Sequence, residues 1–562
     1  MKKLIECVPN FSEGRDLSVI KQITDEIEKI EGVKLLDVDP GAATNRTVVT
    51  FVGTPDEVIE AAFQAVKKAG QLIDMRQHHG AHPRFGATDV CPLVPVANIT
   101  MEETVEYARK LAKRIGEELG ISVYCYESAA FDPKRRNLAY CRAGEYEGLK
   151  EKLATPEGKP DFGPAEFNAF SGATAVGARD FLVAINYNLN TTSTRRANAI
   201  AFDVREKGRP AREGGKVTGK PLKDENGKPV MIPGTLKGTK AIGWFIEEYG
   251  IAQVSMNITN ISQTPVHVAY EEVFAKAAAR GVRVTGAEIV GLIPKKTLID
   301  AGKFYLTKQQ RSVGISEAEI IKIAVKSMGL DDLKPFNPEE KIIEYLLEAD
   351  NKAKKLVDLT CTGFADETAS ESPAPGGGSI SAYMGALAAA LGTMVANLSS
   401  HKAGWDERWE EFSVWAEKGQ AMKDALLHLV DEDTNAFNKI MDAFGLPKKT
   451  DEEKAARSAA IQEATKYATE VPFHTMQEAF KTFDIVQAMA ETGNPNSVTD
   501  AGVGALCARS AVMGAHLNVQ INASSLKDEA FKADILGKAA EIEKQALARE
   551  AEILKIVASK IG

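Results

Sequence analysis

Short apolar runs alternate with segments of helical periodicity along the front part of the chain. The runs at 4–8, 33–38, 47–52, 89–93 and 121–126 predict strands. Between the first two, apolar residues recur every three or four positions and predict a helix: Leu17, Ile20, Ile23, Ile27 and Ile30. Two further helices are predicted at 54–68 and 101–119, and the former should begin with a capping box at Thr54 and with Pro55 at its first position.

The same order of elements then recurs. Strands are predicted at 181–187, 241–246, 252–257 and 282–289, with helices at 193–205 and 266–279. Two successive β-α-β-β-α-β units predict two α/β subdomains, 1–180 and 181–345, each a sheet with helices on one face. The segment 207–240 in the second unit is rich in glycine, proline and lysine, which predicts a mobile basic loop.

Strand patterns stop in the back part of the chain. The charged stretch 346–355 shows no core-facing pattern and is predicted to be a linker. Long helical patterns at 380–398, 418–444, 452–489, 498–521 and 529–561 then predict an all-α bundle over 356–562. Thr450 should begin the third of these helices with a capping box, and Pro472 is expected to kink or split it. The predicted fold is therefore multidomain, with two α/β subdomains followed by a helical bundle.

Composition narrows the class of protein. The chain of 562 residues is too long for one core, and 44% apolar with 26% charged residues is typical of a folded protein. The formal charge of −9 argues against a nucleic-acid partner. The six cysteines show no metal-like spacing and no apolar signal segment follows Met1, so we expect a cytoplasmic protein with reduced thiols.

One uncharged segment, 372–401, is long enough to cross a bilayer. Its central part consists mostly of alanine, glycine, serine and methionine, and its flanks lack the basic and aromatic residues that are typical of membrane spans. It is therefore predicted to be a buried helix of the bundle, and no membrane partner is expected.

Three of the eight histidines lie in the segment 78–84, which reads HHGAHPR. Gly80 and Pro83 disfavour the helix that a metal pair of His78 and His82 would need. An extended His82 beside Arg84 suits general acid/base chemistry on a substrate that carries carboxylates. The alternative is a solvated surface loop.

A second polar group lies where one predicted strand ends and the next begins. It contains Asp39, Asn45 and Arg46. Polar residues at strand ends are often site residues, although a plain β-turn explains these nearly as well.

In the back part of the chain, a glycine turn precedes the uncharged helix. It contains Gly376, Gly377, Gly378 and Ser379. Its backbone N–H groups and the following helix N-terminus favour an anion, but no Lys-Ser/Thr pair follows the glycines, which excludes a nucleotide P-loop. A flexible helix cap is the alternative.

Asp433 interrupts an apolar stripe of a predicted helix. The stripe is formed by residues three or four positions apart: Met422, Leu426, Leu429, Phe437, Ile440 and Phe444. A carboxyl group in a buried stripe loses hydration, which raises its pKa and suits it to donate a proton near neutral pH. The alternative is a structural aspartate that bonds to a backbone or asparagine partner.

Four motifs occur in order along the chain: IECVPNFSEG at 5–14, HPR at 82–84, DFGP at 161–164 and APGGGS at 374–379. Together they closely resemble the bifunctional formimidoyltransferase-cyclodeaminase family over essentially the whole chain. The resemblance implies transfer of the formimino group of formiminoglutamate, a product of histidine degradation, to N5 of tetrahydrofolate. It further implies closure of that product to 5,10-methenyltetrahydrofolate with release of ammonia.

The resemblance also implies roles for particular residues. His82 would be the transferase acid/base and Asp433 the cyclodeaminase proton donor, with Gly376–Ser379 near the folate. Arg46 and Arg84 are the candidates for contacts with substrate carboxylates. The folate-binding segment would be 163–172, which contains Gly163, Pro164, Phe167, Phe170 and Gly172. Neither step needs a metal, a flavin or a nicotinamide.

The implied partners are small molecules and copies of the chain itself. Tetrahydrofolate is expected as a substrate in polyglutamylated form, and basic residues of 207–240 are candidates for holding its glutamate tail. The family implies a homo-oligomer, with dimers through each domain type and a ring-like octamer. Two alternatives stay open: a methenyltetrahydrofolate cyclohydrolase activity in the α domain, and a folate-binding protein without activity.

Overall fold

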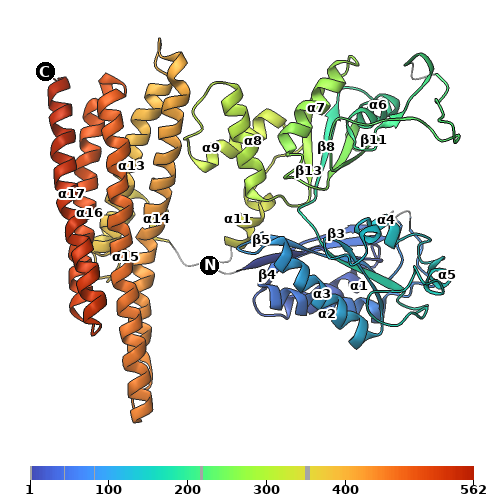
Figure 1. Cartoon of the computed structure of the whole chain (residues 1–562), viewed down its shortest axis with the longest axis horizontal. Helices are drawn as coiled ribbons and strands as arrows, with labels where there is room; N and C mark the ends of the chain where they lie inside the picture. The colour runs from blue at the N-terminus through green and yellow to red at the C-terminus, as the bar shows by residue number, and fades with distance from the viewer. Residues whose placement is uncertain (1–2, 43–44, 81–82, 216–218, 349–354, 562) are drawn as a thin grey trace. The chain divides into compact units, whose positions relative to one another are not determined.

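The structure is a computed structural model and describes residues 3–42, 45–80, 83–215, 219–348 and 355–561. The chain forms two compact units, Met1–Thr297 with Met328–Asn351, and Leu298–Ser327 with Lys352–Gly562. Figure 1 shows sheets and helices in the first unit and helices in the second. The predicted fold class is confirmed.

A seven-stranded sheet forms the core of the first subdomain. Four of its strands run antiparallel in the order β3 (Val33–Gly41), β4 (Arg46–Gly53), β1 (Leu4–Cys7) and β5 (Thr88–Ala97). Beyond β5, the strands β7 (Ala173–Ala178) and β6 (Ser122–Glu127) extend the sheet in parallel, and β2 (Asn10–Phe11) lies between β4 and β5. Three helices pack against it: α1 (Leu17–Glu28), α2 (Pro55–Leu72) and α3 (Met101–Leu119).

Side-chain alternation gives this sheet one apolar and one polar face. Ile5 on β1 and Phe51 on β4 are fully buried in the core that the helices share. Glu6 and Arg46, on the same two strands, lie on the opposite face and line a cavity. The helical face therefore holds the core, and the other face is available for a site.

The second subdomain repeats the same topology. Its elements are β8 (Val183–Leu189), α6 (Thr194–Val204), β11 (Thr239–Ile246), β12 (Ile251–Ile258), α7 (Val266–Ala278) and β13 (Val284–Val290). The antiparallel order β11-β12-β8-β13 corresponds strand by strand to β3-β4-β1-β5. The predicted repeat is confirmed, and both halves have the ferredoxin-like β-α-β-β-α-β arrangement.

The basic segment 207–240 is partly a β-ribbon, although a loop was predicted. β9 (Arg209–Pro210) pairs with β10 (Met231–Ile232), and isolated bridges join Arg212 to Pro221 and Lys223 to Pro229. Backbone pairing therefore joins the two arms of this segment, whereas its composition had indicated an irregular chain.

The two predicted capping boxes have different outcomes. Thr450 and Glu453 form the predicted box at the start of α15 (Asp451–Thr492). The prediction at Thr54 was wrong: Pro55 occupies the first helical position, but the Thr54 side chain makes no capping hydrogen bond. Glu57, the residue that such a box would use, lies beside Gly32 instead.

Several short elements complete the α/β unit and the connection to the helical unit. They are η1 (Pro133–Arg136), α4 (Leu138–Cys141), α5 (Leu149–Leu153), η2 (Glu213–Gly215), α8 (Lys295–Lys308), α9 (Glu317–Met328), α10 (Pro338–Lys341), α11 (Ile343–Glu348), η3 (Leu356–Asp358) and α12 (Cys361–Thr368). By contact, Leu298–Ser327 groups with the helical unit. The boundaries 1–180, 181–345, 346–355 and 356–562 stay a prediction, and most of the predicted linker, 349–354, lies outside the described residues.

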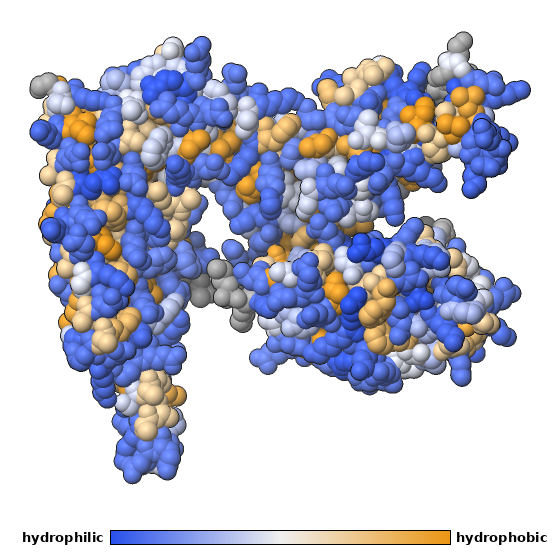
Figure 2. Space-filling model, viewed as in Figure 1, coloured by the Kyte–Doolittle hydropathy of each residue, from blue (hydrophilic) through white to orange (hydrophobic). Residues whose placement is uncertain are grey.

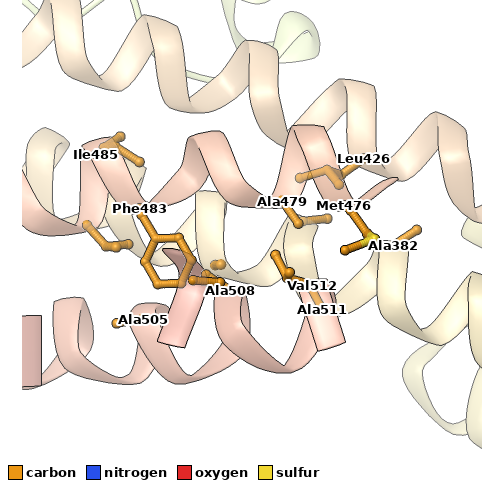
Figure 3. Close-up of a cluster of buried hydrophobic side chains, with 14 of the residues drawn as sticks. Ala382, Leu426, Met476, Ala479, Phe483, Ile485, Ala505, Ala508, Ala511 and Val512 are labelled. Atoms are coloured by element: carbon orange, nitrogen blue, oxygen red, sulfur yellow. The ribbon is translucent and has the colours of Figure 1, made fainter. Parts of the chain in front are cut away.

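Long helices build the second unit: α13 (Gly377–Ser400), α14 (Trp409–Gly445), α15, α16 (Val498–Ser524) and α17 (Glu529–Ile561), with short turns η4 (Asp406–Arg408) and η5 (Pro495–Ser497) between them. Figure 3 shows Leu426, Met476 and Phe483 packed among small side chains such as Ala382 and Ala508. Small residues let helix backbones approach closely, so large side chains fill the remaining space.

The uncharged helix α13 is buried among the other helices of this unit. Among the described residues it is the one helix long and apolar enough to cross a membrane, with a mean hydropathy of 1.5 over its best window, and 61% of that window is buried inside the protein. It packs against α14, α15 and α16. This packing agrees with the prediction that the segment is a buried helix of the bundle.

Pro472 lies inside α15 and does not split it, contrary to one predicted outcome. Proline lacks the N–H that Ala468 O, four residues earlier, would accept in a regular helix. Nδ2 of Asn522 on α16 donates to Ala468 O at 2.6 Å instead. A neighbouring helix therefore supplies the missing donor, and α15 continues through the proline.

Candidate active sites

Two adjoining cavities lie on the polar face of the seven-stranded sheet. The smaller has a volume of about 440 Å³ and the larger about 680 Å³. Five residues line both: Asn10, Arg46, Arg179, Leu182 and Asn257. Asn257 belongs to β12, so the second α/β subdomain supplies part of both walls. Together the cavities form a cleft in which acidic and basic side chains occur in both parts.

Strand register orders the charged groups of the smaller cavity. Along β4, Arg46 pairs with Gly41, Val48 with Asp39, Thr50 with Asp37, and Val52 with Glu6. Each step of two residues moves roughly 7 Å along a strand. The three acidic groups therefore lie progressively farther from Arg46. The larger cavity adds the cationic side chains of Arg142 and Lys240 and the acidic side chains of Glu127 and Asp180.

Burial shifts the pKa values of several groups in this cleft. It lowers the pKa of Arg46 to about 10, partly opposed by Asp89, so the guanidinium stays charged at neutral pH. Burial raises the pKa of Glu6 to about 7, partly opposed by Arg179. The pKa of Asp37 is also raised, first by burial and then by the neighbouring Asp39. The cleft thus combines a permanent cation with carboxyl groups that hold protons more tightly than usual.

His82 lies outside the described residues, but the contacts of its segment are defined on either side. Arg84 Nε donates to His78 Nδ1 at 3.2 Å, so His78 Nε2 carries the ring proton and donates to Asn45 O at 2.8 Å. Asn45 has a positive φ of 48° and its side chain bonds Gly14 N and His79 O. Asn45 therefore joins the histidine segment to the strand end that carries Arg46.

Arg84 is buried and already paired within the protein. Its guanidinium donates to both carboxylate oxygens of Glu147 at 2.8 and 2.9 Å, and to Glu145 at 3.3 Å. Its predicted contact with a substrate carboxylate stays a prediction, and Arg46 in the cleft is the better-placed candidate. The structure does place Asp39 and Arg46 in the lining of the smaller cavity, whereas the Asn45 side chain bonds Gly14 N and His79 O.

The predicted folate segment, 163–172, borders the histidine segment. Phe170 O accepts from Met75 N at 2.9 Å, and Ser171 O accepts from Ala87 N at 2.8 Å. Gly163 and Gly172 have positive φ, and a Cβ would come within 2.2 Å of Ile121 O and 2.3 Å of Phe85 O respectively. A side chain at either position would clash with the backbone, which explains why both residues are glycine.

The other predicted residues of this segment contact the protein itself. Pro164 O accepts from Ser122 Oγ at 2.7 Å, the Phe167 ring lies 5.5 Å from that of Tyr146, and the Phe170 ring lies 5.6 Å from the Arg76 guanidinium. None of them is among the described residues that line the two cavities. Their role in binding folate stays a prediction.

In the helical unit, Asp433 and the glycine turn lie together. Ser379 Oγ donates to Asp433 Oδ2 at 3.1 Å, and a Cβ on Gly378 would come within 2.0 Å of Asp433 Oδ1. The pKa of Asp433 is raised by burial, which outweighs the hydrogen bonds from Ser379 that favour the carboxylate. Glycine at 378 thus gives the carboxyl group access to the N-terminus of α13, although the two segments are far apart in sequence.

The apolar stripe around Asp433 is only partly buried. Leu426 and Leu429 are in the core, whereas Phe437 is 39% and Phe444 49% exposed. The predicted burial of the C-terminal half of the stripe was wrong, because α14 and α15 extend as a projecting pair beyond the other helices (Figure 1). The periodicity identifies a helix face but not how far neighbouring helices cover it.

Three further polar side chains line the Asp433 cavity, which has a volume of about 170 Å³. They are Thr434 on α14 and Asn518 and Asn522 on α16, beside Gly376, Gly377 and Gly378. None of the three was predicted from the sequence. The separation of four residues places the two asparagines on one helix face, but only packing shows that this face meets the glycine turn.

No group of three or more metal-ligating side chains occurs within the residues that the structure describes. All six cysteines are free, as predicted.

Three family models together match most of the chain. The family model described as the N-terminal subdomain of the formiminotransferase domain matches residues 4–179, and that of the formiminotransferase domain matches 184–348. The model described as formiminotransferase-cyclodeaminase matches residues 360–541.

Relatives cover the whole chain and its parts. The formimidoyltransferase-cyclodeaminase of Gallus gallus is 44% identical over 95% of both chains. The glutamate formimidoyltransferase of Streptococcus pyogenes serotype M1 is 43% identical over 54% of this chain and 94% of its own. The methenyltetrahydrofolate cyclohydrolase of Methylorubrum extorquens is 40% identical over 36% of this chain and 98% of its own.

An α/β cleft and a helical site with a buried acid thus occur in one chain, in the order in which full-length relatives match it. The chain belongs to the formimidoyltransferase-cyclodeaminase family.

Proposed function

We propose that this chain is a bifunctional enzyme that transfers the formimino group of formiminoglutamate to tetrahydrofolate and then cyclises the product. In the first step N5 of the folate attacks the protonated formimino carbon, and the bond from that carbon to the glutamate nitrogen breaks. His82 accepts the N5 proton and returns it to the departing nitrogen, a role that suits an imidazole near neutral pH. Arg46 holds a substrate carboxylate.

The charge distribution of the cleft supports this proposal. A pterin presents N–H donors along one edge, and the smaller cavity offers the acidic side chains Asp37 and Asp39. The glutamate portions of both substrates are anionic, and the larger cavity offers Arg142, Arg179 and Lys240. Opposite ends of a folate therefore have complementary partners in the cleft, which helps to position the two substrates for reaction.

In the second step N10 attacks the formimino carbon, and ammonia leaves to give 5,10-methenyltetrahydrofolate. Asp433 supplies the proton that the leaving nitrogen needs. The observation that carries this assignment is the contact of a buried carboxyl group with the glycine turn, Gly376–Ser379, at a cavity. Because burial raises the pKa of Asp433, the group is suited to hold a proton.

Paired variants test the two assignments in one assay. His82→Ala should lower formimino transfer by about 10²–10⁴-fold, the usual contribution of a general acid/base, and leave cyclisation of supplied 5-formiminotetrahydrofolate intact. Asp433→Asn should do the reverse. Ammonia release and methenyltetrahydrofolate absorbance report both steps, and loss of both activities in either variant would contradict two independent sites.

The relative with cyclohydrolase activity makes that reaction the second candidate for the helical unit. Cyclohydrolase activity consumes methenyltetrahydrofolate with water and releases no ammonia. Ammonia release from supplied 5-formiminotetrahydrofolate therefore separates the two candidates, and a binding protein without activity would give neither product.

Polyglutamylated folate, a homo-oligomeric state and a cytoplasmic location are further parts of this proposal. Apolar side chains on the surface of the helical unit support an assembly, since Leu398 is 48%, Leu517 67% and Ile521 66% exposed. Figure 2 shows apolar residues in orange among the polar surface of that unit. The native mass of the purified protein tests the assembly, and cell fractionation tests the location.

A further inference from the structure

Asn518 and Asn522 lie one turn apart on α16 and line the cavity that contains Asp433. Asn518 Nδ2 donates to Gly514 O at 2.8 Å, and Asn522 Nδ2 donates to Ala468 O at 2.6 Å. A carbonyl oxygen can only accept, so these contacts fix which way each amide is turned. In the part of the chain that the structure describes, no donor bonds to either amide oxygen.

The orientation of Asn522 has its cause in α15. Pro472 provides no N–H for Ala468 O, and the Asn522 amide nitrogen replaces that donor. Turning the amide around would leave a backbone carbonyl without a partner, which is costly inside a protein. The amide oxygen of Asn522 is therefore held on the side away from α15.

These two oxygens and the Asp433 carboxyl group provide several hydrogen-bond acceptors in one small cavity, which the Thr434 hydroxyl group and the glycine turn also line. Its volume of about 170 Å³ suits a small group and is too small for a whole folate. Several acceptors can bind a nitrogen that carries several N–H bonds, whereas a hydroxyl group offers only one hydrogen. The three acceptor side chains therefore suit an amino group.

We propose that the amide oxygens of Asn518 and Asn522 hold the nitrogen that leaves as ammonia, an inference that rests on the cyclodeaminase function proposed above. Attack of N10 gives a carbon bonded to N5, N10 and an NH2 group. The N10 proton passes through Asp433 to this NH2 group, the bond from carbon to the protonated nitrogen breaks with its electron pair on nitrogen, and the methenyl cation remains.

The two amide oxygens contribute most when the leaving nitrogen is protonated. Hydrogen bonds to a charged donor are stronger than those to a neutral one, so the contacts strengthen as the nitrogen gains its third hydrogen. Interactions that strengthen along the reaction raise kcat rather than lower KM. Loss of either oxygen should therefore appear mainly in kcat.

The variants separate this role from a structural one. Asn518→Leu removes one amide oxygen. It also removes the side-chain hydrogen bond to Gly514 O, but this carbonyl group lies inside the continuous helix α16 and keeps its backbone partner. Asn522→Leu alone would leave Ala468 O without a donor, so it is combined with Pro472→Ala, which restores the helical N–H. Pro472→Ala alone and Gln520→Leu, at an exposed position of α16, are the matched controls.

Ammonia release from supplied 5-formiminotetrahydrofolate is measured alongside formimino transfer and the melting temperature. Asn518→Leu and Pro472→Ala/Asn522→Leu should each lower kcat for cyclisation about tenfold with little change in KM, while transfer and both controls keep their rates. The proposal is overturned if Pro472→Ala/Asn522→Leu releases ammonia as fast as Pro472→Ala alone. A wild-type protein that releases no ammonia would refute the proposed function instead.

A second probe uses the product itself. Ammonium chloride should inhibit cyclisation more than tetramethylammonium chloride at equal ionic strength, because only ammonium carries N–H donors. This difference should disappear in Asn518→Leu and in Pro472→Ala/Asn522→Leu. Equal inhibition by the two salts in the wild-type protein would count against a site for the leaving nitrogen.

Discussion

Gly378 determines where the Asp433 carboxyl group can lie. A Cβ at this position would come within 2.0 Å of Asp433 Oδ1, a distance that forces the acid to move. Gly378→Ala should therefore lower ammonia release by roughly 10²-fold, since a displacement of about 1 Å in a catalytic group has that effect. Ammonia release from supplied 5-formiminotetrahydrofolate measures it.

The matched control for this variant is Gly376→Ala in the same turn. A Cβ at Gly376 would have as its nearest neighbour Pro373 O at 3.7 Å, which is an ordinary contact. Gly376→Ala should thus keep most of its cyclisation rate, and both variants should keep formimino transfer. Equal losses in the two variants would mean that the turn needs flexibility rather than space for Asp433.

Glu6 makes stability depend on pH. Burial raises its pKa to about 7 in the folded protein, above its ordinary value of about 4.3. Between these values the folded state binds the proton more tightly than the unfolded state, so stability falls as pH rises towards 7 and is level above it. Glu6→Gln should therefore be more stable than wild type at pH 8, by up to about 4 kcal/mol, and similar at pH 4.

Melting temperatures at pH 4 and pH 8 check this expectation. Glu28→Gln, at an exposed position of α1, serves as the control, and its difference in melting temperature from wild type should be the same at the two pH values. A Glu6→Gln variant that is less stable than wild type at pH 8 would show that the ionised carboxylate makes a favourable contact in the cleft.

At the scale of elements, helix ends with similar sequences differ in their capping. Thr100 begins α3 with a capping box, in which its side chain accepts from Glu103 N and Glu103 bonds back to Thr100 N. Thr54 begins α2 without a side-chain hydrogen bond. Thr100→Ala should lower the free energy of unfolding by about 1 kcal/mol, and Thr54→Ala by a few tenths at most. Urea unfolding of the two variants provides the measurement, and equal losses would contradict it.

The helix α15 illustrates how one element depends on another. Sequence alone predicts a kink or a break at Pro472, because the proline removes a helical hydrogen bond. The Asn522 amide restores a donor to Ala468 O from the next helix, and α15 runs on. The outcome depends on packing between two segments that lie far apart in sequence.

At the scale of the whole molecule, the chain has net charge −9, yet its proposed substrates are anionic. Exposed basic residues of the ribbon segment 207–240, such as Lys220, Lys223 and Lys228, are our candidates for holding a polyglutamate tail. With a polyglutamylated folate, ammonia should appear with a shorter lag after formimino transfer than with a monoglutamyl folate. This advantage should shrink at high salt and when the three lysines are replaced by alanine.

Pre-steady-state measurement of ammonia release tests this expectation. Replacement of Lys134 by alanine, at an exposed position outside the ribbon, is the control for a general change in charge. Equal transfer efficiency with mono- and polyglutamylated folate would count against a role for the ribbon.

Much of the fold could be predicted from the sequence because local patterns express it. Hydrophobic periodicity gives α3 and α17 with the bounds that the structure has, and the repeated order of elements gives two sheets of the same topology. The same periodicity singled out Asp433, because a carboxyl group within an apolar stripe is conspicuous without any knowledge of its surroundings.

Only the tertiary structure decided which groups meet. It showed that Arg84 is paired with Glu147, that Asp433 contacts Ser379 and that Asn522 completes α15. Each of these contacts joins segments separated by more than fifty residues, and no local pattern encodes such a distance. The sequence by itself determined the elements and one acid, whereas packing of distant segments determined the surroundings that set the chemistry of each site.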